Sequence, residues 1–172
     1  MASLMENLMD ILEKENTEYE ALLELSKRKT PIIIKGDIAA LQQITDEEQL
    51  VVDKVVLLDR KREEVMKDIA NVVNKDVESL KLNQIVLMLE PRPQEQKRLA
   101  KARDALHTSV HSLAKVNEMN SALIKQSLEL VEFDMNLIKS MNSSPETAEY
   151  NRAATVNGGY SANVRGSFDA KQ

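Results

Sequence analysis

Residues 94–141, which contain neither proline nor glycine, read QEQKRLAKARDALHTSVHSLAKVNEMNSALIKQSLELVEFDMNLIKSM. At about 1.5 Å of rise per residue, a continuous helix over this range would be roughly 70 Å long. Residues spaced three and four apart form one row along it, which is typical of a helix packed against other helices. The row comprises Leu99, Ala102, Leu106, Val110, Leu113, Val116, Asn120, Leu123, Ser127, Val131, Met135 and Ile138.

The apolar row widens after Asn120. Beyond this residue, apolar side chains are expected over most of the helix circumference. A helix that is apolar on nearly every side requires partners on more than one side. We expect one partner to be the rest of the chain and another to be a different protein. The widened region contains Leu123, Ile124, Leu128, Leu130, Val131, Phe133, Met135, Leu137 and Ile138.

The composition is that of a helical protein. Of 172 residues, 30% are charged and 42% hydrophobic, with only four glycines, four prolines, three tyrosines and two phenylalanines. The net charge of −5 argues against a nucleic-acid partner, and the absence of cysteine excludes disulfides. No apolar run is long enough to span a bilayer, and acidic residues interrupt the region where a secretory signal needs an apolar core. We therefore expect a cytoplasmic protein without stable membrane insertion.

The expected fold is all-α, an elongated antiparallel helical bundle or coiled coil with one long C-terminal helix and a disordered C-terminal tail. Gly36 ends the first helix, Asp37 caps the second, and Thr45 with Glu48 forms a capping box for the third. Pro91 stops the fourth helix before the long one begins. The predicted bundle domain covers residues 1–141, with helices at about 3–35, 38–44, 46–74, 80–89 and 94–141.

Two charged residues fall on or beside the apolar rows of the shorter helices. Glu15 lies at the edge of the row in the first helix, where we expect a solvated carboxylate. Arg62 occupies a position that would be apolar in the row of the third helix, which begins with Leu50. Pro31 is expected either to kink the first helix or to begin its last turns with Thr30 as the cap.

Residues 142–172 form the predicted flexible tail. They hold three of the four glycines and many small polar residues. Such a segment buries too little apolar surface to offset the cost of ordering its backbone, about 1–2 kcal/mol per residue. The tail nevertheless carries three aromatic residues, Tyr150, Tyr160 and Phe168. Because aromatic side chains supply much contact area, we expect them to become ordered on a partner.

The sequence offers no candidate for catalysis, for a cofactor or for a metal site. Its two histidines, His107 and His111, lie four apart on one face of the long helix, and we identify no ligand set around them. The segment from His111 to Lys115 is similar to histidine phosphotransfer bundles. Those bundles carry a lysine three residues after the histidine and then a glycine, whereas position 114 is Ala114 here. Two solvated histidines are the favoured interpretation, and a phosphotransfer bundle using His111 remains an alternative.

Groups of residues along most of the chain match a known family in order and spacing. They are Leu12, Glu15, Tyr19 and Leu22-Leu23; Lys35-Gly36-Asp37 and Leu41; Glu48 and Leu50; Leu58-Asp59-Arg60-Lys61-Arg62; Asn117, Asn120, Leu123-Ile124 and Ser127-Leu128; and Ser167-Phe168-Asp169-Ala170-Lys171. On these residues the chain resembles the FlgN-type flagellar export chaperones. The resemblance implies a cytoplasmic helical chaperone, which is not an enzyme.

The resemblance also implies partners. Members of this family bind terminal segments of hook-associated proteins 1 and 3 through the C-terminal part of the chaperone. They deliver this cargo to the membrane export gate and its ATPase components. A C-terminal tyrosine is implied in docking at the gate, and both Tyr150 and Tyr160 match it. With Phe168, these residues are the predicted tail anchors.

The pattern of the long helix agrees with this role. A groove beside the widened row can accept an amphipathic cargo helix, and asparagines in the row would cost stability but fix the register. A structural coiled-coil adaptor remains an alternative, in which the wide row is a homodimer interface. The predicted cargo-binding residues are Asn117, Asn120, Leu123, Ile124, Leu128, Val131 and Met135.

Overall fold

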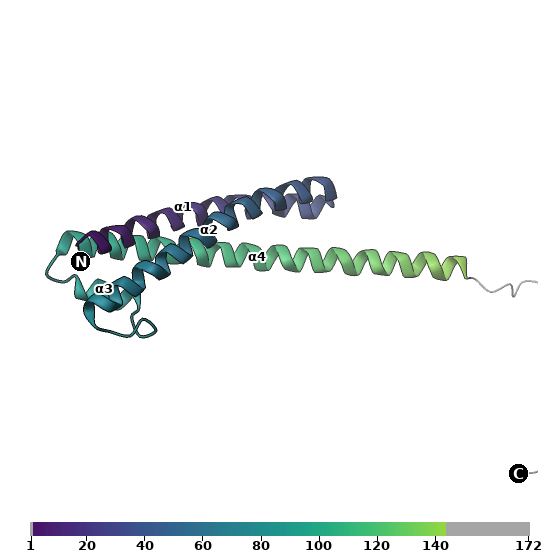
Figure 1. Cartoon of the computed structure of the whole chain (residues 1–172). Coiled ribbons are helices and arrows are strands. Elements are labelled where there is room, and N and C mark those ends of the chain that lie inside the picture. Colours follow the sequence, from purple (N-terminus) through teal and green to yellow (C-terminus); the bar gives the residue numbers. More distant parts are fainter. Residues whose placement is uncertain (1, 144–172) are drawn as a thin grey trace, which may run out of the picture. The chain divides into compact units, whose positions relative to one another are not determined.

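The computed structural model describes residues 2–143, which fold into four helices and contain no strand (Figure 1). The helices are α1 (Ala2–Lys35), α2 (Ile38–Val73), α3 (Leu82–Met88) and α4 (Pro93–Asn142). The predicted all-α class and the long last helix are therefore confirmed. The chain divides into two compact units, Met1–Glu132 and Phe133–Gln172, and each is described by itself. The domain boundary predicted between residues 141 and 142 stays a prediction, and the tail beyond 143 lies outside the described residues.

A tight turn joins α1 and α2 and makes them an antiparallel pair. Gly36 has a φ of +68°, in the left-handed region that glycine adopts without steric cost. Its N–H donates to the Ile33 carbonyl oxygen over 3.0 Å, which closes the end of α1. The Asp37 carboxylate accepts a hydrogen bond of 3.0 Å from the N–H of Ala40 at the start of α2. The end of the first helix and the cap of the next are as the sequence predicts.

The predicted break near Thr45 is wrong, because α2 runs without interruption from Ile38 to Val73. The Thr45 hydroxyl donates to the Leu41 carbonyl oxygen over 2.8 Å, within the helix, instead of capping a new one. Ile44, just before it, is buried in unit 1, so this part of α2 is covered on one side. Local capping chemistry is therefore overridden by packing. Pro31 likewise lies inside α1, which continues to Lys35, so a new start at Thr30 is also wrong.

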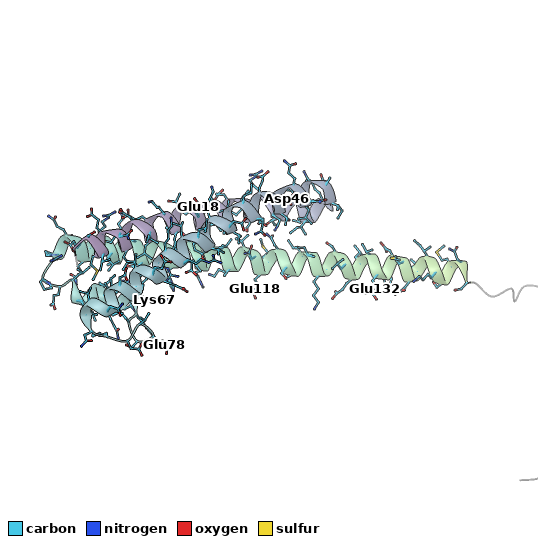
Figure 2. All side chains as sticks on the ribbon, viewed as in Figure 1. Glu18, Asp46, Lys67, Glu78, Glu118 and Glu132 are labelled. Carbon is cyan, nitrogen blue, oxygen red and sulfur yellow. The ribbon has the colours of Figure 1, made fainter. Side chains whose placement is uncertain are left out.

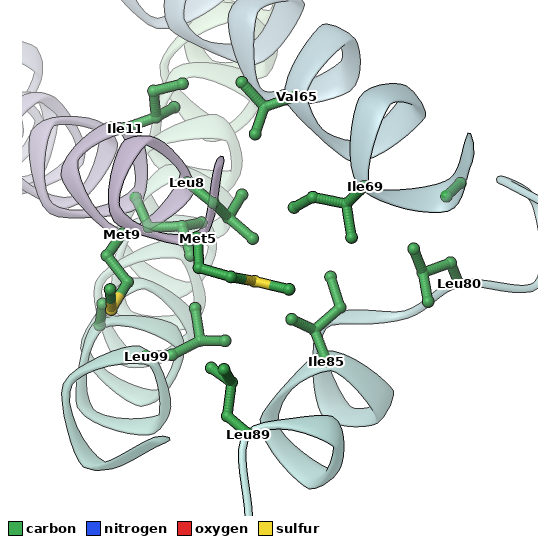
Figure 3. Close-up of a cluster of buried hydrophobic side chains, with 13 residues drawn as sticks. Met5, Leu8, Met9, Ile11, Val65, Ile69, Leu80, Ile85, Leu89 and Leu99 are labelled. Carbon is green, nitrogen blue, oxygen red and sulfur yellow. The ribbon is translucent and has the colours of Figure 1, made fainter. Parts of the chain in front are cut away.

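The larger core lies where the first turns of α1 meet the end of α2, α3 and the first turns of α4 (Figure 3). Met5 and Leu8 of α1 point into this core. The side chains facing them are Ile69 of α2, Ile85 of α3 and Leu99 of α4. Each such side chain contributes about 1.5–3 kcal/mol when it is fully buried. This core fixes α3, which would be too short to persist alone.

A second, smaller core joins the three long helices further along unit 1. It consists of Leu22 of α1, Val55 of α2 and Leu113 of α4. Val51 packs against it from α2, whereas Leu50 is 67% exposed, so the prediction that Leu50 belongs to the buried row is wrong. One position separates the two residues, which turns their side chains about 100° apart around the helix. The buried face therefore includes Val51 and leaves Leu50 in solvent.

The three long helices of unit 1 alternate in direction, so α4 runs parallel to α1 there (Figure 1). Hydrogen bonds join residues of α1 to residues of α4 in ascending order along both helices: Asn16 with Ser109, Ser26 with Asn117 and Thr30 with Asn120. The turn at Gly36 reverses the chain between α1 and α2, and residues 74–92, which include α3, lead it back to the start of α4. The first and last long helices are therefore parallel.

Candidate binding surface on α4

A layer of polar side chains lies past the second core of unit 1. We call Ser26, Thr30, Asn117 and Asn120, with Lys29 and Glu48, the polar layer. The Asn120 amide nitrogen donates to the Ser26 carbonyl oxygen over 2.9 Å, and the Thr30 hydroxyl donates to the Asn120 amide oxygen over 2.7 Å. The Ser26 hydroxyl donates to the Asn117 amide oxygen over 2.9 Å. Because Asn120 is only 3% exposed, these bonds are made in a protected environment and fix the register of α4 on α1.

Helix α2 joins the polar layer through a mostly buried ion pair. The Lys29 ammonium donates to the Glu48 carboxylate, and both side chains are largely covered. The Ser26 hydroxyl lies 3.3 Å from the other Glu48 oxygen. A buried ion pair is tolerated when further hydrogen bonds complete its coordination, and this layer supplies them. The predicted site residues Asn117 and Asn120 are therefore hydrogen-bonded to α1 of the same chain.

Beyond the polar layer, unit 1 leaves the apolar side chains of α4 uncovered. Leu128 is 65% and Leu130 is 62% exposed, and Ile124 and Val131 are exposed too. Leu123, which directly follows the polar layer, is half-buried. In Figure 2 this part of α4 lies between the labelled residues Glu118 and Glu132. Four of the predicted cargo-binding residues therefore belong to one continuous helical segment, and three of them face solvent.

The described part of the second unit also exposes apolar side chains. It consists of residues 133–143, the end of α4 and the residue after it. Met135, the last predicted cargo-binding residue, is exposed there. Its exposed apolar neighbours are Phe133, Leu137, Ile138 and Met141. The described end of this unit thus presents apolar surface and only a few charges.

The predicted site residues are accompanied by further exposed apolar side chains on α4. They include Leu130, Phe133 and Leu137, which are about as exposed as the predicted apolar residues that face solvent. All three belong to the widened apolar region that the sequence predicts, but they were not assigned to the site. The widening of the row after Asn120 was the signal that identifies them.

The interface between α1 and α2 contains a buried carboxylate, and the expectation that Glu15 is solvated is wrong. Glu15 is 3% exposed and accepts a hydrogen bond of 3.0 Å from the Arg62 Nε. Arg62 also donates to Asp59 on its own helix. Burial raises the pKa of Glu15 above its ordinary value, although Arg62 opposes the shift. The two charged residues that interrupt the apolar rows are thus partners of each other.

A second ion pair ties the start of α4 to α1. The Arg98 guanidinium donates to both Glu13 carboxylate oxygens over 2.8 Å and to Asp10 over 2.6 Å. The hydrogen bond from Arg98 lowers the pKa of Glu13, mainly against the effect of burial. These groups are half-exposed, so the cluster supports the orientation of α4 with a modest contribution to stability.

The remaining residues considered for chemistry form no assembled site. The His107 and His111 rings stack with centroids 6.3 Å apart on an exposed face of α4. Within residues 2–143, no three His, Cys, Asp or Glu side chains gather where they could hold a metal ion. Over the same range, none of the helices is long and apolar enough to cross a bilayer. Tyr150, Tyr160 and Phe168 lie outside the described residues.

Comparison with known proteins places the chain in a family. A family model described as FlgN protein matches residues 1–158. No curated protein and no solved structure matches the chain. The match covers most of the sequence, including all four helices. The chain therefore belongs to the FlgN family, whose members are flagellar export chaperones.

Proposed function

We propose that this chaperone works in the cytoplasm, where it binds hook-associated proteins 1 and 3 of the flagellum. It keeps them from associating before export and delivers them to the export gate. The observation that carries this proposal is the uncovered apolar surface of α4 beyond the polar layer, which in unit 1 includes Ile124, Leu128 and Val131. Family membership supports a chaperone role in general, and this surface supports a specific place for cargo.

The uncovered side chains are well suited to bind an amphipathic helix. Burying one aliphatic side chain fully contributes about 1.5–3 kcal/mol. Ordering the cargo and losing its free motion remove much of the sum. The remaining free energy fits a complex that holds cargo and still releases it at the gate. Contiguous apolar surface of this kind on a soluble protein usually marks an interaction site.

The polar layer has a supporting role in this proposal. It separates the part of α4 that packs on its own chain from the part that binds cargo. We assign Asn117 and Asn120 to the boundary of the cargo site, where their bonds to α1 hold α4 in register. Leu123, Ile124, Leu128 and Val131, with Met135 in the second unit, are the proposed cargo contacts.

The tail has a separate proposed role. Tyr150, Tyr160 and Phe168 dock the loaded chaperone on the export gate or its ATPase components. This assignment rests on the family resemblance and on the aromatic content of the tail. Removing residues 144–172 should change the melting temperature by less than about 2 °C, because the small polar residues of this segment offer little apolar surface to bury. Secretion of hook-associated proteins by the truncated strain should fall, and unchanged secretion would contradict the tail's role.

The cargo surface is tested by changing one exposed leucine to a charged residue. Leu128→Glu should weaken binding of purified hook-associated protein 1 or 3 at least tenfold in calorimetric titrations. Leu50→Glu is the matched control, since Leu50 is equally exposed but lies on α2 in the same unit. It should change the affinity less than twofold. Equal effects of the two substitutions, or no effect of Leu128→Glu, would contradict the assignment.

A homodimeric adaptor is the second candidate function, and the same exposed surface favours it. In that case two copies of α4 would cover each other. Light scattering of the cargo-free protein distinguishes the two. A dimer that persists on dilution to nanomolar concentration supports the adaptor, whereas a monomer supports the chaperone with an open cargo site.

A further inference from the structure

Two exposed leucines in unit 1 point in nearly opposite directions. Leu128 is 65% and Leu130 is 62% exposed. At about 100° of rotation per residue, two positions place their side chains about 160° apart around α4. A single neighbouring helix covers a strip of about 100°. One bound helix therefore cannot cover both leucines.

The two leucines belong to separate rows along α4. The first row contains Ile124, Leu128 and Val131, at spacings of four and three. The second row contains Met119, Leu123 and Leu130, at spacings of four and seven. Both spacings keep side chains on one helical face. Apart from the half-buried Leu123, all of these residues are exposed.

The first row is continuous with an established interface. It extends the series in which Leu113 and Asn120 are buried against α1 and α2. The spacing from Leu113 to Asn120 is seven, and from Asn120 to Ile124 it is four, so all lie on the same face. In this part of unit 1, α4 packs against a pair of antiparallel helices. The first row therefore continues the face of α4 that other helices of the chain cover in unit 1.

The described end of the second unit repeats this arrangement in its own sequence. Met135 and Ile138 continue the spacing of the first row, and Phe133 and Leu137 continue that of the second. All four are exposed within their unit. Phe133 and Met135 are again two positions apart, which turns them about 160° from each other. The two-row pattern is therefore independent of any single unit.

We propose that one cargo molecule covers α4 with two helices, one on each row. This inference rests on the proposed chaperone function and names the form of its cargo as a helix pair. The occupant is a single chain that supplies both helices with apolar residues at spacings of three and four.

Charge favours this cargo over a second copy of the chaperone. Between the polar layer and the end of unit 1, α4 carries Glu129 and Glu132 against Lys125 alone. The whole chain has a net charge of −5. A second copy would bring the same acidic helix against itself, whereas cargo helices with basic flanks would be attracted. The bound pair therefore has lysine or arginine beside its apolar rows.

Site-specific cross-linking tests the proposal directly, because the chain has no cysteine of its own. Leu128→Cys and Leu130→Cys are each labelled with a benzophenone maleimide and irradiated with full-length hook-associated protein 1. We expect cross-links from the two positions to map to two different segments of the cargo. Native mass spectrometry should show one chaperone bound to one cargo molecule. Leu50→Cys serves as the control and should give no specific cross-link.

The outcomes separate this inference from the function on which it rests. Cross-links from both positions to the same cargo segment would overturn the helix pair and leave the chaperone role intact. Complexes with two chaperones, or with two cargo chains, would also overturn it. If the unmodified chaperone binds neither hook-associated protein 1 nor hook-associated protein 3, the proposed function fails and the inference fails with it.

Discussion

Replacing Arg62 with alanine removes the cation that is bonded to the buried Glu15 carboxylate. Glu15 is 3% exposed, and Arg62 donates to it over 3.0 Å. Breaking a buried ion pair by deleting one partner typically costs about 3–5 kcal/mol. Because the Arg62 side chain is itself 32% exposed, water can reach the vacated space. We therefore expect the lower end of that range, about 3 kcal/mol at pH 7.

The cost of Arg62→Ala should depend on pH with a defined sign. Burial already raises the pKa of Glu15, and Arg62 is the group that opposes the shift. Without Arg62, the folded-state pKa rises further above the ordinary value of 4.5. A folded state that holds its proton more tightly loses stability as the pH rises from the unfolded to the folded pKa. The unfolding free energy of the variant should therefore be closest to that of the wild type near pH 4.5. The difference should be largest at pH values above the folded-state pKa of Glu15.

Urea unfolding followed by circular dichroism at several pH values measures this effect. Glu15→Gln is the matched variant, since its amide still accepts a hydrogen bond but carries no charge to desolvate. We expect Glu15→Gln to cost less than about 1 kcal/mol and to remove most of the penalty when combined with Arg62→Ala. A loss below 1 kcal/mol for Arg62→Ala, or no rescue in the double variant, would refute this reasoning.

Three further substitutions test the packing of unit 1 by urea unfolding. Leu113→Ala should lower the unfolding free energy by about 2–4 kcal/mol because it empties part of the second core, and a loss under 1 kcal/mol would contradict that position. Leu128→Ala should change it by less than about 0.5 kcal/mol because the side chain is exposed. Arg98→Gln should lower the unfolding free energy by less than about 1 kcal/mol, and this loss should be smaller in high salt. Because Arg98 lowers the pKa of Glu13, this difference should be present above about pH 4.5 and vanish in acid.

Local chemistry made much of the fold predictable from the sequence. A glycine in the left-handed region and an aspartate that caps the next helix are short-range features, so the turn at Gly36 and Asp37 was predictable. The long helix was predictable because no proline or glycine interrupts it. The continuity of α2 at Thr45 was not predictable, because the capping signature there competes with the burial of Ile44, which depends on the tertiary fold.

Long-range partners explain what the sequence did not reveal. Glu15 looked like an edge residue because Arg62, which neutralises it, lies on another helix. Asn120 was predicted to fix register, and its bonds to α1 agree with that role. The exposure of Leu128 was predictable from the excess of apolar residues. The sequence also placed Leu130 in the widened apolar region, but the division of that region into two rows was not predicted.

Hydrogen–deuterium exchange with and without cargo tests the central claim most directly. Backbone amides of α4 after Asn120 belong to a helix that its own unit leaves uncovered, so they should exchange quickly in the free protein. Addition of hook-associated protein 1 or 3 should slow exchange in peptides covering residues 121–142, while peptides covering residues 94–113 stay unchanged. Protection confined to α1 and α2, with residues 121–142 exchanging as before, would contradict the claim that cargo binds this part of α4.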